Sequence, residues 1–134
     1  MIRIFDNELL KIWFFPSELP LMPISEEEEL WKRELSNFKK YQFHFSRGYA
    51  RIALSTLFNL KPLEVPIIAR PNKPPFLKNS FGFVSISHCN DGLIIGWSLS
   101  KLGIDIESRN RPIGIKKLSK FLLSSQEMEY LYSE

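Results

Sequence analysis

Residues 83–107 read FVSISHCNDGLIIGWSLSKLGIDIE. This stretch predicts three consecutive strands, at 83–88, 92–99 and 101–107. Side chains two apart on a strand share a face, so Asp105 and Glu107 are expected to project together. Two carboxylates on one rigid face suit Mg²⁺, which usually takes one or two carboxylates together with phosphates and water.

The flanking sequence predicts an α+β protein with a mainly antiparallel sheet packed against a long helix. A helix at 26–37 begins at the capping box formed by Ser25 and Glu28, and its acidic first turn is expected to be solvated. The longest apolar stripe at helical spacing lies at 46–59. The remaining elements are expected to be strands at 2–5, 11–15 and 65–69, a turn at Asp91-Gly92, and helices at 113–120 and 124–133.

The composition indicates one soluble domain with a basic segment. The 134 residues are 44% hydrophobic, which excludes a largely disordered chain. There is one cysteine, no secretory signal and no stretch of membrane-spanning length, so we expect a cytoplasmic protein without a membrane partner. Residues 32–101 carry eleven Lys or Arg against three Asp or Glu, a net charge of +8. This segment favours an anionic partner: nucleic acid, a phosphorylated cofactor or an acidic protein.

Each candidate for chemistry also has a structural interpretation. Asp105 and Glu107 can form the polar face of a half-exposed strand. Arg47 and Arg51, four apart on one helix, can be solvated surface arginines. Lys73 can be an ordinary loop lysine.

The neighbouring His88 and Cys89 do not predict a thiol nucleophile, because adjacent strand residues point to opposite faces. Cys89 is expected to be a small buried residue, and His88 alone can be a structural histidine. The single cysteine and the histidines at 44 and 88 also lack the usual spacing of zinc ligands.

The order of these residues is more specific than any one of them. Arg47 begins the long helix, Lys73-Pro74 follows in a loop, Ser-Ile-Ser-His occupies 85–88, and Gly-Ile-Asp-Ile-Glu occupies 103–107. In this order and spacing the chain resembles the 4′-phosphopantetheinyl transferases of the surfactin-synthetase-activating type. These enzymes move the phosphopantetheine arm of coenzyme A onto a serine of an acyl or peptidyl carrier protein.

The resemblance implies a role for each matched residue. Asp105 and Glu107 would hold Mg²⁺ against the coenzyme A pyrophosphate while 3′,5′-ADP leaves. Arg47 and His88 would bind the 3′-phosphate, Arg47 as a forked donor. The other cofactor-binding positions implied are Ser87 beside His88, Lys73 and Pro74 on the adenine side, and Lys32 near an N-terminal phosphate-binding lysine of the family.

The same resemblance implies one half of a pseudo-dimer. Residues 1–100 correspond to the N-terminal subdomain, and 101–134 to a truncated start of the second. The family's third block, Trp-x-x-Lys-Glu-x-x-x-Lys, supplies a further metal ligand and is absent from these 134 residues. We therefore assign no catalytic residue and expect little or no transferase activity from the chain alone. A homodimer is expected to replace the missing half.

Two alternatives remain. The chain can be a catalytically dead remnant that binds coenzyme A or another nucleotide through Arg47, Lys73 and His88. It can also be a basic nucleic-acid-binding module, although that interpretation leaves Asp105 and Glu107 without a role and predicts steeply salt-dependent binding. The resemblance favours coenzyme A as the anionic partner over nucleic acid.

Overall fold

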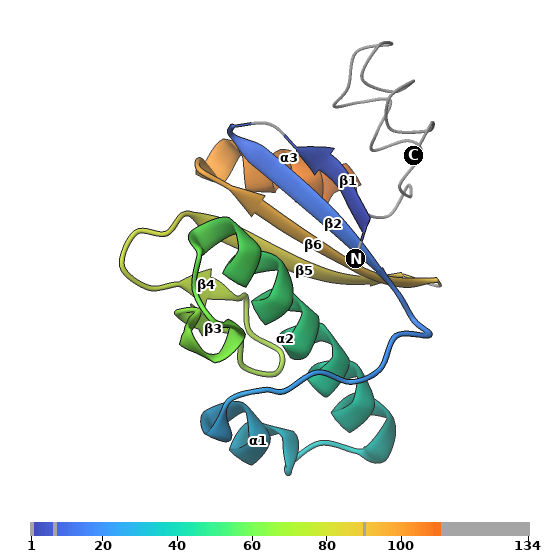
Figure 1. Ribbon diagram of the computed structural model, residues 1–134. Coiled ribbons are helices and arrows are strands. Elements are labelled where there is room, and N and C mark those ends of the chain that lie inside the picture. The colour runs from blue at the N-terminus through green and yellow to red at the C-terminus, as the bar shows by residue number, and fades with distance from the viewer. Residues whose placement is uncertain (1, 7, 90, 111–134) are drawn as a thin grey trace.

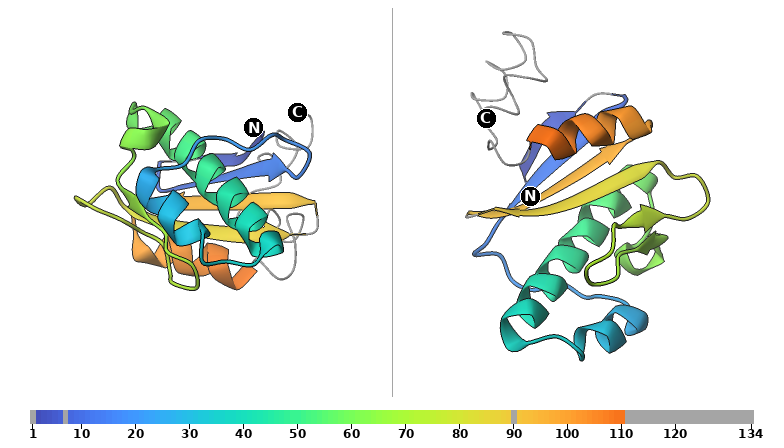
Figure 2. Two further views of the ribbon diagram at one scale, coloured as in Figure 1. Left: turned by 90° about the horizontal axis from the view of Figure 1, so that it is seen from below. Right: turned by 180° about the vertical axis from the view of Figure 1, so that it is seen from behind.

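The structure is a computed structural model that describes residues 2–6, 8–89 and 91–110 (Figure 1). Its centre is a four-stranded antiparallel sheet in the order β1-β2-β6-β5. The strands are β1 (Ile2–Asp6), β2 (Leu10–Pro16), β5 (Phe83–Cys89) and β6 (Gly92–Ser98). Helix α2 (Asn37–Phe58) lies on one face of this sheet and α3 (Lys101–Asn110) on the other (Figure 2). The predicted α+β class is confirmed.

Strands β5 and β6 form a hairpin whose register runs from Phe83 opposite Ser98 to Cys89 opposite Gly92. Gly92 is thus the first residue of β6, at the start of the predicted strand 92–99 and next to the predicted turn. A Cβ at this position would lie 2.2 Å from the carbonyl oxygen of Phe15 on β2. Glycine is therefore required by the close approach of β2 and β6.

The hydrophobic core lies between α2 and the sheet. Of the predicted apolar stripe, Tyr49, Ala53 and Leu54 are buried, while Ile52 and Leu57 pack at its margin. The helix is longer than predicted and begins after Ser36, whose extended backbone is typical of an N-cap. In the described part of the chain, neither α2 nor any other helix is long and apolar enough to cross a membrane.

Helix α1 (Glu26–Lys32) begins with the predicted capping box and packs against α2. The Ser25 hydroxyl accepts the Glu28 N–H at 3.1 Å, and the Glu28 carboxylate accepts the Ser25 N–H at 2.8 Å. The prediction of a solvated acidic turn is wrong for Glu28, which is 1% exposed because Arg51 of α2 pairs with it. After α2 come the short helix η1 (Pro62–Glu64) and a small hairpin of β3 (Ile67–Ile68) and β4 (Phe76–Leu77).

The strand predicted at 101–107 is wrong, because the chain turns into helix α3 directly after β6. The Ser98 hydroxyl accepts the Ser100 N–H at 3.1 Å, and the Ser100 hydroxyl accepts the Gly103 N–H at 3.3 Å. The second contact is typical of a helix N-cap, which satisfies an N–H of the first turn. Helix α3 packs on β5 and β6, on the face of the sheet opposite α2 (Figure 2). The helices predicted at 113–120 and 124–133 lie outside the described residues.

Candidate anion-binding site

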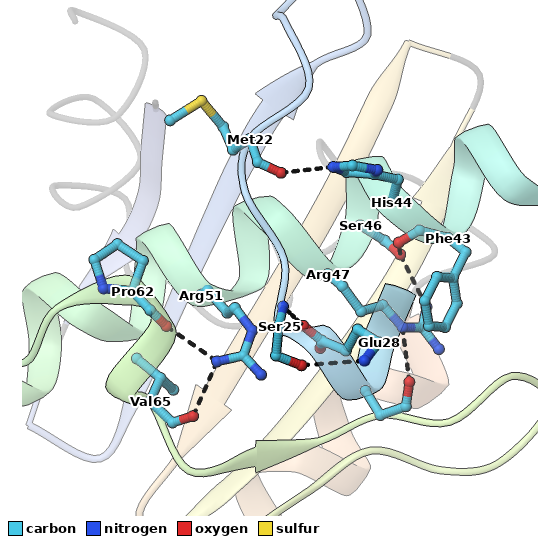
Figure 3. A network of polar contacts seen from close by, with 11 residues as sticks. Met22, Ser25, Glu28, Phe43, His44, Ser46, Arg47, Arg51, Pro62 and Val65 are labelled. Atoms are coloured by element: carbon cyan, nitrogen blue, oxygen red, sulfur yellow. Dashed lines mark hydrogen bonds and ion pairs between the residues drawn. The ribbon is translucent and has the colours of Figure 1, made fainter. Parts of the chain in front are cut away.

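Arg47 lies in the middle of α2 with its guanidinium held by three hydrogen bonds. Nε donates to the carbonyl of Ala69 at 2.9 Å, Nη1 to the Ser46 hydroxyl at 2.8 Å, and Nη2 to the carbonyl of Arg70 at 3.2 Å. The guanidinium carbon also lies 4.2 Å from the centre of the Phe43 ring, one turn earlier on α2. Figure 3 shows Arg47 between Ser46, Phe43 and Glu28.

The Ser46 side chain fixes the direction of one of these bonds. Its hydroxyl is fully buried and donates to the Phe43 carbonyl at 3.0 Å, which leaves its lone pairs for Arg47. A guanidinium has five N–H donors, of which Arg47 uses one on each nitrogen. Two donors, one each on Nη1 and Nη2, have no partner among the described residues. They form a fork of the kind that binds phosphate.

The charges around Arg47 do not balance. Burial lowers the pKa of Arg47 to about 10, and the negative charge of Glu28 opposes this shift. Glu28, however, is already paired with Arg51, with 2.7 Å between Oε1 and Nε. One buried carboxylate thus serves two arginines. The surplus positive charge lies at Arg47, where a bound anion would compensate it.

His88 lies on β5, which packs against α2, the helix that carries Arg47. Its side chain is exposed, but neighbouring atoms exclude part of the water around the ring; this desolvation and, second, the positive charge of Arg47 lower the pKa of His88 below its usual 6.5. His88 borders a groove of about 240 Å³ together with Phe45 and Tyr41 of α2. The two residues predicted to bind one phosphate, 41 positions apart in sequence, thus lie on two elements that pack against each other.

The Lys73-Pro74 loop is connected to the same guanidinium. The Lys73 N–H donates to the Arg70 carbonyl at 3.3 Å, and this oxygen also accepts from Arg47. The Lys73 side chain is exposed, as expected of a ligand-binding or a plain surface lysine. Pro74 lines a second pocket of about 470 Å³, which lies between the loop, β5 and α3 and also includes Asp105.

The predicted carboxylate pair is not on one face. Positions two apart on a helix are separated by about 200° around its axis, so positions 105 and 107 lie on nearly opposite sides of α3. Asp105 is exposed at the edge of the second pocket. No cluster of three or more His, Cys, Asp or Glu suited to a metal occurs within the described residues. The backbone of α3 therefore gives no support to a shared Mg²⁺ site at these two positions, and we derive no step through a metal.

Ser87 and Lys32 lie apart from the guanidinium. Ser87 is half-buried on β5, and strand alternation turns it away from the face that carries His88. Lys32 is engaged at the end of α1, where its Nζ lies 3.0 Å from Nδ1 of His44 and 3.1 Å from Oε2 of Glu29. Neither residue adds to the cationic site around Arg47.

Sequence reasoning missed the residues that support Arg47. Ser46, Phe43 and Glu28 have no chemical role of their own, and their importance comes from contacts made only in the folded chain. One signal was present: Arg47 and Arg51 are four residues apart, which predicted a shared helix face. Their interpretation as solvated surface arginines is wrong for Arg51, which is buried.

Comparisons with known proteins do not extend this picture. No family model, curated protein or solved structure matches the chain.

Proposed function

We propose that the chain binds coenzyme A by its 3′-phosphate and serves holo-[acyl-carrier-protein] synthase type transfer of 4′-phosphopantetheine to a carrier-protein serine. The observation that carries the proposal is the Arg47 guanidinium, which is held rigid, has two donors to spare and bears uncompensated charge. The effect of the Arg47 charge on His88 supports it, since a bound phosphate would offset that charge and favour a protonated His88. The basic segment 32–101 fits both the cofactor and an acidic carrier protein.

The chain's own residues would bind and orient the cofactor. Arg47 and His88 would hold the 3′-phosphate, while Lys73 and Pro74 would border the adenine. Transfer itself breaks the bond between the pyrophosphate oxygen and the β-phosphorus of coenzyme A. The carrier serine oxygen attacks this phosphorus, gives up its proton and forms the new phosphodiester, and 3′,5′-ADP leaves. Mg²⁺ at Asp105, which would neutralise charge on the pyrophosphate, stays a prediction of the resemblance.

The test is titration calorimetry with coenzyme A and with dephospho-coenzyme A, which lacks only the 3′-phosphate. A hydrogen bond to a charged group contributes about 1.5–3 kcal/mol, so wild-type protein should bind coenzyme A at least tenfold more tightly. The substitution Arg47→Gln should remove most of this preference. The control is Lys39→Gln, which removes a positive charge from an exposed position on the same helix. Equal affinity of wild type for the two ligands would refute the proposal.

A second candidate is coenzyme A binding without transfer. The separation of residues 105 and 107 around α3 favours it, because a transferase of this type needs a metal against the pyrophosphate. A carrier-loading assay separates the candidates: transfer predicts that an acyl or peptidyl carrier protein gains the mass of phosphopantetheine. Tight binding with an unmodified carrier identifies the binding-only protein.

We further propose that a second copy of the chain supplies the other half of the pseudo-dimer. Phe76 and Phe83, which line the pocket next to α3, are 54% and 42% exposed, and grouped apolar side chains of this kind commonly form interfaces. Light scattering should give a dimer mass, and Phe83→Ser should shift it toward the monomer. A wild-type monomer at high concentration would exclude this arrangement.

A further inference from the structure

We propose that Arg47 is also a positioning residue for the loop at 69–74. The same guanidinium would thus bind the 3′-phosphate and set the position of the loop on the adenine side of the cofactor site. This inference rests on the proposed function and adds a second role to Arg47. Its basis is that one guanidinium binds two successive carbonyls of the loop, Ala69 at 2.9 Å and Arg70 at 3.2 Å.

The loop has few N–H groups with which to stabilise its own conformation. Three of the six residues at 70–75 are prolines, which have no N–H to donate. Asn72 has a positive φ of 62°, a left-handed conformation that asparagine tolerates better than most L-residues and that forms a tight turn. The Lys73 N–H bonds back to the Arg70 carbonyl, the same oxygen that Arg47 binds. The turn that presents Lys73 and Pro74 therefore closes on an oxygen whose position Arg47 sets.

Arg47 can impose this position because it is fixed from the helix side. The Ser46 hydroxyl and the Phe43 ring hold the guanidinium against α2. A lysine at position 47 would keep the charge, but an ammonium is a single point without the planar fork that reaches two carbonyls and Ser46 together. Charge and geometry can thus be separated by Arg47→Lys.

The first experiment uses the ligand without the 3′-phosphate. If Arg47 only bound that phosphate, Arg47→Gln and Arg47→Lys would leave the affinity for dephospho-coenzyme A unchanged. Because Arg47 also sets the loop on the adenine side, we expect both variants to bind dephospho-coenzyme A about three- to tenfold more weakly than wild type. Lys39→Gln should match wild type. Unchanged affinity in both Arg47 variants would overturn the inference.

The second experiment needs no ligand and so stays informative if the chain does not bind coenzyme A. Amide hydrogen exchange of Lys73 is compared, by NMR, between wild type and Arg47→Lys. Release of the Arg70 carbonyl should speed exchange at Lys73 by about tenfold or more, while Ile95 in the buried centre of β6 keeps its protection. Ser46→Ala, which removes only the bond that orients Nη1, should give a smaller change in the same direction and serves if Arg47→Lys folds poorly. Wild-type exchange at Lys73 in the variants would contradict the positioning role.

Discussion

Glu28 on α1 and Arg51 on α2 form an ion pair that is sealed from water, with 2.7 Å between Oε1 and Nε and side-chain exposures of 2% and 5%. The remaining donors of Arg51 reach beyond the pair: Nη1 binds the carbonyls of Pro62 at 3.1 Å and Val65 at 3.2 Å. The pair thus joins α1, α2 and the segment around η1. Arg47 lies one turn before Arg51 on α2 and is within the influence of the Glu28 charge, so we expect loss of the pair to disturb the anion site as well.

Replacing Glu28 with alanine should therefore destabilise the protein strongly. The change leaves the Arg51 charge buried without a partner, which costs about 3–5 kcal/mol. It also removes the carboxylate that completes the capping box with Ser25. The free energy of unfolding is measured by urea denaturation. Glu27→Ala, one position earlier and exposed, is the control and should change stability by about 0.5 kcal/mol or less. Similar values for the two variants would show that the pair does not hold α1 in place.

The close approach of β2 and β6 makes a second prediction. In Gly92→Ala the new Cβ would lie 2.2 Å from the Phe15 carbonyl oxygen, so the two strands must separate locally. We expect a loss of about 1–3 kcal/mol, typical of overpacking. The matched variant is Asp91→Ala in the adjoining turn, where the side chain is exposed and the loss should be much smaller. Equal midpoints of thermal unfolding for the two variants would contradict the register of the hairpin.

Most elements of the fold could be predicted from local sequence signals, but the helix at residues 101–107 could not. The capping box at Ser25 and the alternating apolar residues of 83–88 are decided by near neighbours, and both elements begin where predicted. The first helix, however, ends at Lys32, five residues before the predicted end at 37. Residues 101–107 alternate as a strand does, yet they form a helix. Ser100 caps its first turn, while Ser98 turns the chain away from the sheet. A period of two over five residues is too short a signal to outweigh a cap.

Single residues of the candidate site could be predicted from the sequence, but the contacts that hold Arg47 could not. Arg47 and His88 were identified from their order in the chain, and the structure places them on α2 and β5, two elements that pack together. The geometry that makes Arg47 rigid comes from Ala69 and Arg70, more than 20 positions away, and local patterns carry no information on such contacts. The same limit explains why Glu28 was predicted to be solvated: its partner lies 23 positions later, on another helix.

The lowered pKa of His88 predicts a dependence of stability on pH. Because the folded pKa lies below the unfolded value of 6.5, the unfolded state binds the proton more readily. The stability contribution of neutral His88 is thus complete above about pH 6.5 and is lost as the pH falls toward the folded pKa. Wild type should lose more thermal stability between pH 7.5 and 5 than His88→Gln. His44 is present in both proteins, so it does not contribute to the difference between them. A difference between the two proteins that is constant with pH would contradict the shift.

A bound phosphate should have the opposite effect on His88, because an anion beside the imidazole favours its charged form. The affinity of wild type for 3′,5′-ADP is expected to rise as the pH falls from 7.5 to 6. His88→Gln should lack this rise, whereas Lys39→Gln should retain it. Calorimetry at several pH values measures it, and parallel curves for wild type and His88→Gln would exclude His88 from the phosphate site.

The response to Mg²⁺ distinguishes the transferase from the binding-only protein. If Asp105 helps to hold the ion against the pyrophosphate, millimolar Mg²⁺ should increase the affinity of wild type for dephospho-coenzyme A by about tenfold, or 1.4 kcal/mol. This ligand keeps the pyrophosphate and excludes any effect of the ion on the 3′-phosphate. Asp105→Asn should bind equally with and without Mg²⁺. The control Asp91→Asn, also exposed, should respond as wild type does.

Because residue 107 lies on the opposite side of α3 from residue 105, a response lost in Asp105→Asn but kept in Glu107→Gln would mean that Asp105 acts without Glu107. Wild-type binding that ignores Mg²⁺ would instead leave a protein that holds coenzyme A through Arg47 and His88 and does not transfer its arm.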